Sequence, residues 1–186
     1  MNRKGYSLIE LVAAIGLFLM LSFVLWSILG RQIRMIRELS VRNELFDISE
    51  ITEHILKQRL ERTMTPLYIQ NREGELQNYE DFSGGAFRSF FFSEPLYEES
   101  QRRFVRKYHV LNFKPESRKL LYREGGTSKE GLMELTGGYD IATRVESVEL
   151  HKTAGGALRF SILFREGDIA YRREIFIYPE KAGEEG

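Results

Sequence analysis

The sequence predicts an α+β fold, in which one long N-terminal helix precedes a domain of antiparallel β-strands. Residues 11–30 form an uncharged apolar run, and residues 31–65 contain no glycine or proline while apolar side chains recur mostly every three or four positions. After Pro66 the pattern changes to short segments rich in aromatic and β-branched residues, separated by pairs of glycines. A helical region followed by a run of strands favours the α+β class.

The apolar run at residues 11–30 is a candidate transmembrane helix, because about 20 helical residues cross the hydrocarbon core of a bilayer. A cleaved secretory signal has a shorter apolar core, of about 7–15 residues, and a small-x-small cleavage site, which residues 26–30 do not supply. Basic residues flank both ends of the run, so charge alone does not orient it. A large C-terminal domain can be translocated despite flanking charge, which allows the N-terminus to stay in the cytoplasm.

The helical period continues beyond the apolar run. Pro66 disfavours helical geometry in the residue before it, so the helix is expected to end near residues 63–65. The spacing drifts from strict heptads, which favours packing on the chain's own sheet over a free coiled coil. The expected partner is the sheet face of Phe160, Ile162 and Phe164. The predicted apolar stripe comprises Ile33, Ile36, Val41, Leu45, Ile48, Ile51, Ile55 and Leu60.

Segments with strand composition follow Pro66. Glycine pairs lie between them, where turns need positive φ or a tight reversal. Residues 153–156 and 166–168 look like hairpin turns, which predicts an antiparallel meander over residues 145–178. The predicted strands are residues 87–92, 104–111, 119–123, 145–151, 158–164 and 170–178.

The composition excludes several classes of function. The 27 lysines and arginines balance the 27 aspartates and glutamates, so no long-range field attracts a polyanion. The absence of cysteine excludes disulfides, thiolate metal sites and thiol nucleophiles. His54, His109 and His151 lack the spacing of a zinc site, and a surface or interface role is expected for them. No cofactor or metal is expected.

Two segments resemble ligand-binding motifs only in part. Residues 126–131 have the outer spacing of a phosphate loop, but Leu132 and Met133 stand where lysine and serine or threonine are needed. Residues 102–108 interleave basic with aromatic residues, which could bind single-stranded nucleic acid through phosphate contacts and stacking. An edge strand whose cations discourage aggregation is the favoured interpretation. Nucleic acid is therefore not an expected partner, and no catalytic motif indicates an enzyme.

The strongest signal lies at the head of the chain, where Glu10 is placed at the edge of the apolar run. A carboxylate in a membrane costs free energy, least near the interface, so it needs a partner or a cap. Ser7 and Glu10 form an S-x-x-E capping box, which is the local explanation.

Residues 5–12, Gly-Tyr-Ser-Leu-Ile-Glu-Leu-Val, also resemble the processing motif of type IV prepilins and type II secretion pseudopilins. The resemblance covers residues 1–30 and implies a pilin-type fold. It further implies that a prepilin peptidase cleaves after Gly5 and methylates the new N-terminal amine of Tyr6, an aromatic residue where the family usually has phenylalanine. Glu10 would then pair with the N-terminal amine of a neighbouring subunit, a contact that low dielectric surroundings strengthen.

The resemblance implies a minor pseudopilin, most similar in its strand-rich body to the J-type, that helps to initiate a type II secretion pseudopilus at its tip complex. The implied partners are other minor and major pseudopilins, the prepilin peptidase, the inner-membrane assembly platform and membrane lipid. Alternatives are a minor pilin of a type IV pilus, a competence pseudopilus subunit for DNA uptake, or a membrane-anchored enzyme or binding module.

The expected location is the cytoplasmic (inner) membrane, crossed once, with the N-terminus in the cytoplasm and the C-terminal domain in the periplasm or another extracytoplasmic space. The expected organisation is a leader peptide at residues 1–5, a transmembrane helix at 6–30, an amphipathic helix extension at 31–65, a β-rich domain at 66–179 and a flexible tail at 180–186.

Overall fold

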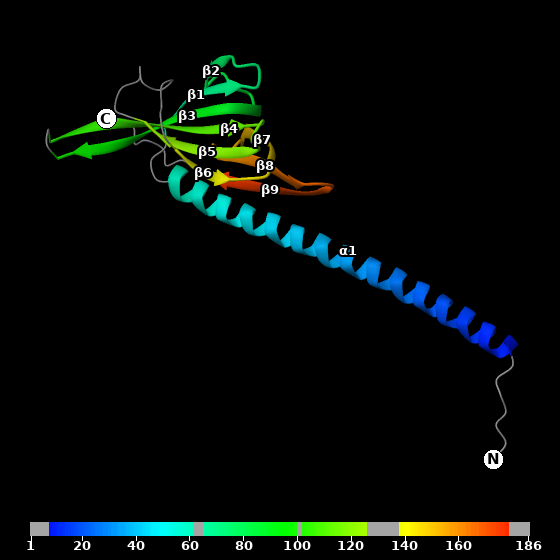
Figure 1. The fold of residues 1–186 in the computed structure, drawn as a ribbon. Coiled ribbons are helices and arrows are strands. Elements are labelled where there is room, and N and C mark those ends of the chain that lie inside the picture. Colours follow the sequence, from blue (N-terminus) through cyan, green and yellow to red (C-terminus); the bar gives the residue numbers. More distant parts are fainter. Residues whose placement is uncertain (1–7, 62–64, 100–101, 126–137, 179–186) are drawn as a thin grey trace. The chain divides into compact units, whose positions relative to one another are not determined.

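The computed structural model describes residues 8–61, 65–99, 102–125 and 138–178 (Figure 1). Gly5, Tyr6, the segment 126–131 and the tail at 180–186 lie outside the described residues. One helix precedes a nine-stranded sheet in which all pairs are antiparallel, so the predicted α+β fold is confirmed. The elements are α1 (Leu8–Leu60), β1 (Thr65–Asn71), β2 (Leu76–Asn78), β3 (Gly85–Glu98), β4 (Arg103–Lys114), β5 (Lys119–Glu124), β6 (Tyr139–Ala142), β7 (Val145–Lys152), β8 (Leu158–Glu166) and β9 (Ile169–Ile177).

The chain divides into two compact units, residues 1–41 and residues 42–186. The first unit contains the N-terminal part of α1. The second contains the rest of α1 together with every described strand.

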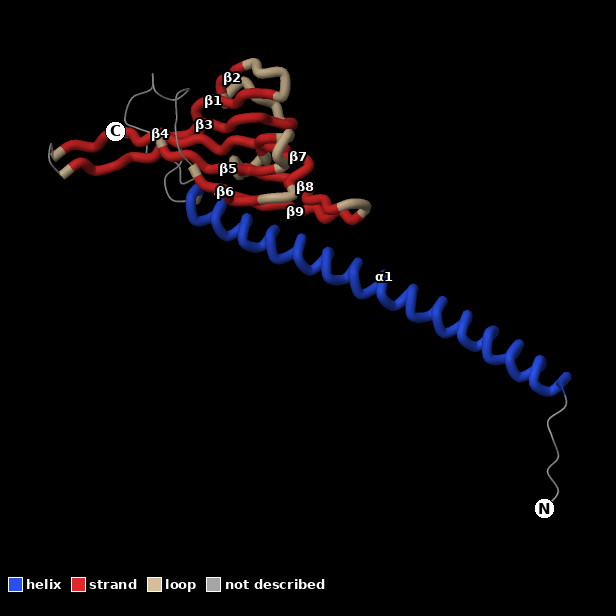
Figure 2. Tube along the Cα trace, viewed as in Figure 1, coloured by secondary structure: helices blue, strands red, loops and turns tan. Residues whose placement is uncertain are grey.

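The sheet of the second unit has the order β6-β5-β4-β3-β7-β8-β9, with β1 paired to β3 and β2 paired to β1 (Figure 2). The predicted C-terminal meander is confirmed as β7, β8 and β9. Its first turn is closed by a 3.0 Å hydrogen bond from the Gly156 amide to the Thr153 carbonyl. Its second turn contains Gly167 at φ 58°, a conformation that glycine adopts without strain.

All six predicted strands are present, in most cases longer at one or both ends, but β1, β2 and β6 were not predicted. β1 contains Pro66, which normally argues against a strand, and the β1–β3 register shifts between Pro66 and Tyr68. β2 and β6 are short, so they carry little alternation to detect. The helix ends at Leu60 rather than near residues 63–65, because Thr65 already pairs with Ser93 of β3.

The helical part of the second unit buries a narrower seam than the predicted stripe. Ile33, Ile36 and Ile51 are 65%, 66% and 59% exposed, so their assignment to the buried stripe was wrong. Two polar residues take part instead, because Ser49 and Thr52 donate 2.7 Å hydrogen bonds to the helix carbonyls of Phe46 and Ile48. The buried residues of α1 are Leu45, Ser49, Thr52, Leu56 and Leu60.

Aromatic rings dominate the core of the sheet. Phe90 has its ring centroid 5.6 Å from that of Phe92 and 5.9 Å from that of Phe160, and Phe87 contacts both Phe90 and Phe160. Phe160, Ile162 and Phe164, the face predicted to pack against the helix, are fully buried. In a chain without cysteine, this apolar burial supplies the main stabilisation.

Candidate functional site

The apolar part of α1 is a candidate membrane span. Phe18, Phe23 and Trp26 are each 70% exposed or more, which a helix of a soluble core would not show. Among the described residues, α1 is the one helix long and apolar enough to cross a bilayer. Glu10 lies exposed in its first turn, at the edge of the apolar segment.

Within the second unit, ion pairs join the C-terminal half of α1 to residues of the sheet domain. Arg173 Nε of β9 donates a 2.6 Å hydrogen bond to Glu53 Oε2, and Lys57 Nζ lies 2.8 Å from Glu53 Oε1. Hydrogen bonds from Lys57 and Arg173 hold the pKa of Glu53 below its usual value, although burial opposes the shift. Arg144, before β7, reaches Glu44 at 2.8 Å.

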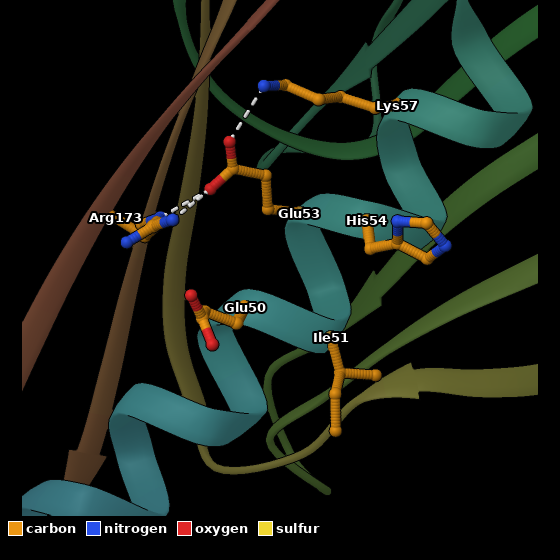
Figure 3. Close-up of a pocket in the computed structure, with 6 residues that line it drawn as sticks. All are labelled: Glu50, Ile51, Glu53, His54, Lys57 and Arg173. Carbon is orange, nitrogen blue, oxygen red and sulfur yellow. Dashed lines mark hydrogen bonds and ion pairs between the residues drawn. The ribbon is translucent and has the colours of Figure 1, made fainter.

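The same region forms an open hollow of about 540 Å³ beside α1 (Figure 3). Its most central carboxylate, Glu53, is already neutralised by Lys57 and Arg173, as the dashed lines in Figure 3 show. The contact between Glu53 and Arg173 therefore joins α1 to β9 across the hollow. Because Glu53 is paired in this way, it is not an unpaired buried charge that a ligand could bind. The residues that line the hollow are Glu50, Ile51, Glu53, His54, Lys57 and Arg173.

A second polar cluster surrounds His109, on β4. The His109 ring is 1% exposed and stacks with Phe92 and with Tyr122 at centroid distances of 5.4 and 5.5 Å, and the centroids of those two rings lie 6.2 Å apart. Its Nδ1 lies 2.7 Å from the Tyr122 hydroxyl. Its Nε2 lies 3.0 Å from Glu94 Oε1, close in distance but not aligned as a hydrogen bond. The expected surface role is wrong for His109.

Burial lowers the pKa of His109, although the Glu94 carboxylate opposes the shift. Burial also raises the pKa of Tyr122, so its hydroxyl stays protonated. A histidine, a tyrosine and a glutamate in contact could suggest acid–base chemistry. Both rings are almost completely buried, however, so no substrate can reach them, and the cluster instead joins β3, β4 and β5.

The remaining histidines are far from this cluster. His54 lies on α1 beside the hollow of Figure 3, and His151 lies on β7 with Nε2 3.7 Å from Glu149. Among the described residues, no group of three histidine, aspartate or glutamate side chains could hold a metal ion.

The arginine-rich segment lies on a hairpin that we call the β3–β4 arm, formed by residues 94–98 of β3 and 103–107 of β4 (Figures 1 and 2). The rings of Tyr97 and Phe104 meet across the arm at 5.2 Å, and Phe104 is 75% exposed. β5 pairs with β4 only from His109 onward, so residues 103–107 have β3 as their one strand partner among the described residues. Among the described residues, this pairing agrees with the edge-strand interpretation of the segment.

The Glu94–His109–Tyr122 cluster escaped the sequence analysis because its members come from three strands. The alternation of the predicted strand at residues 104–111 places His109 on the same face as Val105 and Leu111, which was a usable signal that His109 points inward. Nothing in the sequence indicates that Glu94 lies beside it.

Comparison of the chain with protein-family models, with curated proteins and with solved structures gives no match. The architecture itself is pilin-like, since one long, apolar N-terminal helix continues into a segment that packs on an antiparallel sheet.

Proposed function

We propose that the chain is a minor pseudopilin, a membrane-anchored structural subunit of a type II secretion-type pseudopilus. The observation that carries this proposal is the nature of α1. Its N-terminal part is apolar and exposed, with Glu10 in its first turn, whereas residues 42–60 dock on a sheet domain. A helix of this kind can join subunits within the membrane while each subunit presents its own folded domain outside it.

Glu10 has the central role in assembly. After cleavage behind Gly5, the new ammonium of Tyr6 and the Glu10 carboxylate of a neighbouring subunit carry opposite charges. At the membrane edge each charge is costly alone, and pairing removes much of that cost. Because the pair forms only when two helices are offset by a fixed distance, it sets the register between subunits.

The subunit acts by assembly and not by catalysis. The buried His109 cluster is closed to substrates, and the hollow beside α1 has its central carboxylate neutralised. Its partners are other major and minor pseudopilins, the prepilin peptidase, the assembly platform and membrane lipid.

Replacement of Glu10 tests this function in cells that produce the neighbouring pseudopilins. Glu10→Ala is expected to insert into the membrane as the wild type does, because it removes a charge from the apolar helix. Crosslinked complexes with partner subunits should be lost. Glu38→Ala, on the exposed part of the same helix beyond the apolar run, is the matched control and should crosslink normally. Normal crosslinking of Glu10→Ala would reduce Glu10 to a helix cap.

A competence pseudopilus is the second candidate, because Arg102, Arg103 and Arg106 lie exposed near the Tyr97–Phe104 pair. Such a surface could contact phosphates and stack on bases. Titration with single-stranded and duplex DNA at about 0.15 M salt separates the two functions. Tight binding that is lost in Arg103→Ala and Arg106→Ala would favour DNA uptake.

A further inference from the structure

The β3–β4 arm has an outer backbone edge on β4 with which no described strand pairs. The Gly125 amide donates a 2.7 Å hydrogen bond to the Tyr108 carbonyl, on the side of β4 that faces away from β3. Alternate residues of a strand direct their N–H and C=O groups to the same side, and the β3–β4 register runs without a shift. Phe104 and Arg106 therefore direct their backbone groups outward, where no described strand pairs with them.

The opposite edge of the arm, on β3, lacks one backbone N–H donor. Pro95 on β3 is paired with Arg106, whose backbone groups point away from β3. The Pro95 nitrogen consequently faces the outer side of β3, and proline has no N–H to donate there. Proline on an edge discourages strand addition, so of the two sides of the arm, as far as the described residues show, the β4 side is the better acceptor.

The side chains of residues 103–106 indicate the chemistry of a strand that could bind beside β4. Arg103 and Arg106 have no ion-pair partner among the described residues, whereas Lys107 already pairs with Glu124 at 2.8 Å. Between the two arginines lie Phe104, which is strongly exposed, and Val105. Along residues 103–106, the edge therefore presents a basic residue, two apolar residues and a second basic residue.

We propose that residues 103–107 of β4 bind an extended peptide segment by β-strand addition, and that the segment has two apolar residues flanked by acidic ones. Its backbone would pair with Phe104 and Arg106. Its apolar side chains would lie beside Phe104 and Val105, and its two carboxylates beside Arg103 and Arg106. Main-chain hydrogen bonds supply the affinity in this mode, and the alternate side chains supply the selectivity.

An acidic peptide fits this edge better than a nucleic acid does. Glu94, Glu98 and Glu99 line the β3 side of the arm and would repel an extended polyanion. A peptide strand touches only the β4 side and uses backbone groups that a nucleic acid cannot match. The pairing of β3 with β4 runs without a shift from Ser89 to Glu98, so the strand of the arm is already formed before the peptide arrives.

The test uses the full chain in zwitterionic detergent micelles and two fluorescent peptides. The acidic probe is Gly-Ser-Glu-Val-Val-Glu-Ser-Gly, and its control has lysine in place of both glutamates. Binding of the acidic probe should be about tenfold tighter, because two exposed charge pairs are exchanged for two repulsions. Arg103→Glu with Arg106→Glu should reverse the preference. Arg172→Glu, an exposed change on β9, should leave it unchanged.

A second comparison separates strand addition from simple charge attraction. Phe104→Pro removes the outward amide, whereas Phe104→Ala removes the ring and keeps the amide. The proline variant should bind the acidic probe about fivefold more weakly than the alanine variant, as expected for one lost backbone hydrogen bond. In the unchanged chain, the probe should slow amide exchange at Phe104 and Arg106. Val105, whose N–H faces β3, should change little.

Three outcomes would overturn the inference. The first is that neither peptide binds. The second is that a single-stranded oligonucleotide binds more tightly than the acidic probe. The third is that the acidic probe binds without slowing amide exchange at Phe104 and Arg106. No other pseudopilin enters these measurements, so their failure would leave the proposed filament function standing.

Discussion

His109 illustrates how a single residue gains its role from its surroundings. Histidine is intermediate in burial among the residue types, but here the ring is 1% exposed and stacks with Phe92 and with Tyr122. The charged groups that face it are Glu94 from β3, Lys107 from its own strand and Glu124 from β5. Burial dominates these influences and lowers the pKa of His109. The neutral imidazole is thus the form that the fold stabilises.

The pKa of His109 predicts a loss of stability in mild acid. Because the folded-state pKa lies below the unfolded value of about 6.5, the unfolded chain binds more protons as the pH falls through that value. The free energy of unfolding should therefore fall by about 1 kcal/mol between pH 7.5 and pH 5.5. The carboxylates with lowered pKa values, Glu44, Glu53 and Glu124, lose their stabilising contributions only at more acidic pH.

Chemical denaturation of the full chain in detergent at the two pH values measures this effect. His109→Gln, which can still hydrogen-bond to Tyr122, should lose most of the pH dependence. His54→Gln on α1 is the control and should retain it. An unchanged pH dependence in His109→Gln would show that another group is responsible.

At the scale of elements, long segments with clear periodicity were predictable and close contacts between segments were not. β8 was predicted with the right first residue and an end two residues early, because Leu158, Phe160, Ile162 and Phe164 alternate with Arg159, Ser161 and Arg165, interrupted only by Leu163. The buried face of the helix was predicted only in part: Leu45 and Leu60 are buried as expected, but Ser49 and Thr52 were missed because they look like surface residues until the sheet lies against them. The close approach is visible in the 3.3 Å contact of Thr52 Oγ1 with the Ile141 carbonyl of β6.

The observed burial along α1 predicts a large loss of stability for one substitution and a small change for another. Leu56→Ala should lower the free energy of unfolding by about 2–5 kcal/mol, because Leu56 is 1% exposed and its removal leaves a cavity. Ile51→Ala should change it by no more than about 0.5 kcal/mol, because the side chain faces outward. Denaturant titration of both variants checks the seam. Similar losses from the two changes would restore the stripe predicted from sequence.

At the scale of the whole molecule, the two compact units have different physical requirements. The unit of residues 1–41 exposes large apolar side chains and needs lipid or partner helices to cover them. The unit of residues 42–186 contains its own buried seam and its own aromatic core. The sequence indicated this division through the change from an uncharged run to an amphipathic period. The boundary expected from the sequence, between residues 30 and 31, comes before the one at Arg42, because the charge pattern changes at residue 31 while the helical pattern continues through residue 42.

The division predicts that a protein beginning at Arg42 folds without a membrane. It retains all described strands and the buried residues of α1, so it should be soluble without detergent and unfold in one cooperative transition. Size-exclusion chromatography and thermal unfolding by circular dichroism measure both properties. Aggregation in the absence of detergent, or a transition without cooperativity, would mean that residues 1–41 are needed to complete the core.

The intact mass of the chain tests whether it is processed as a pilin-like subunit. The chain should be purified from cells that carry a prepilin peptidase and from matched cells that lack it. With the peptidase, the mass should correspond to a chain that begins at Tyr6 and carries one added methyl group. Without it, residues 1–5 should remain. Retention of residues 1–5 in cells with the active peptidase would mean that the chain is not a substrate of the prepilin peptidase.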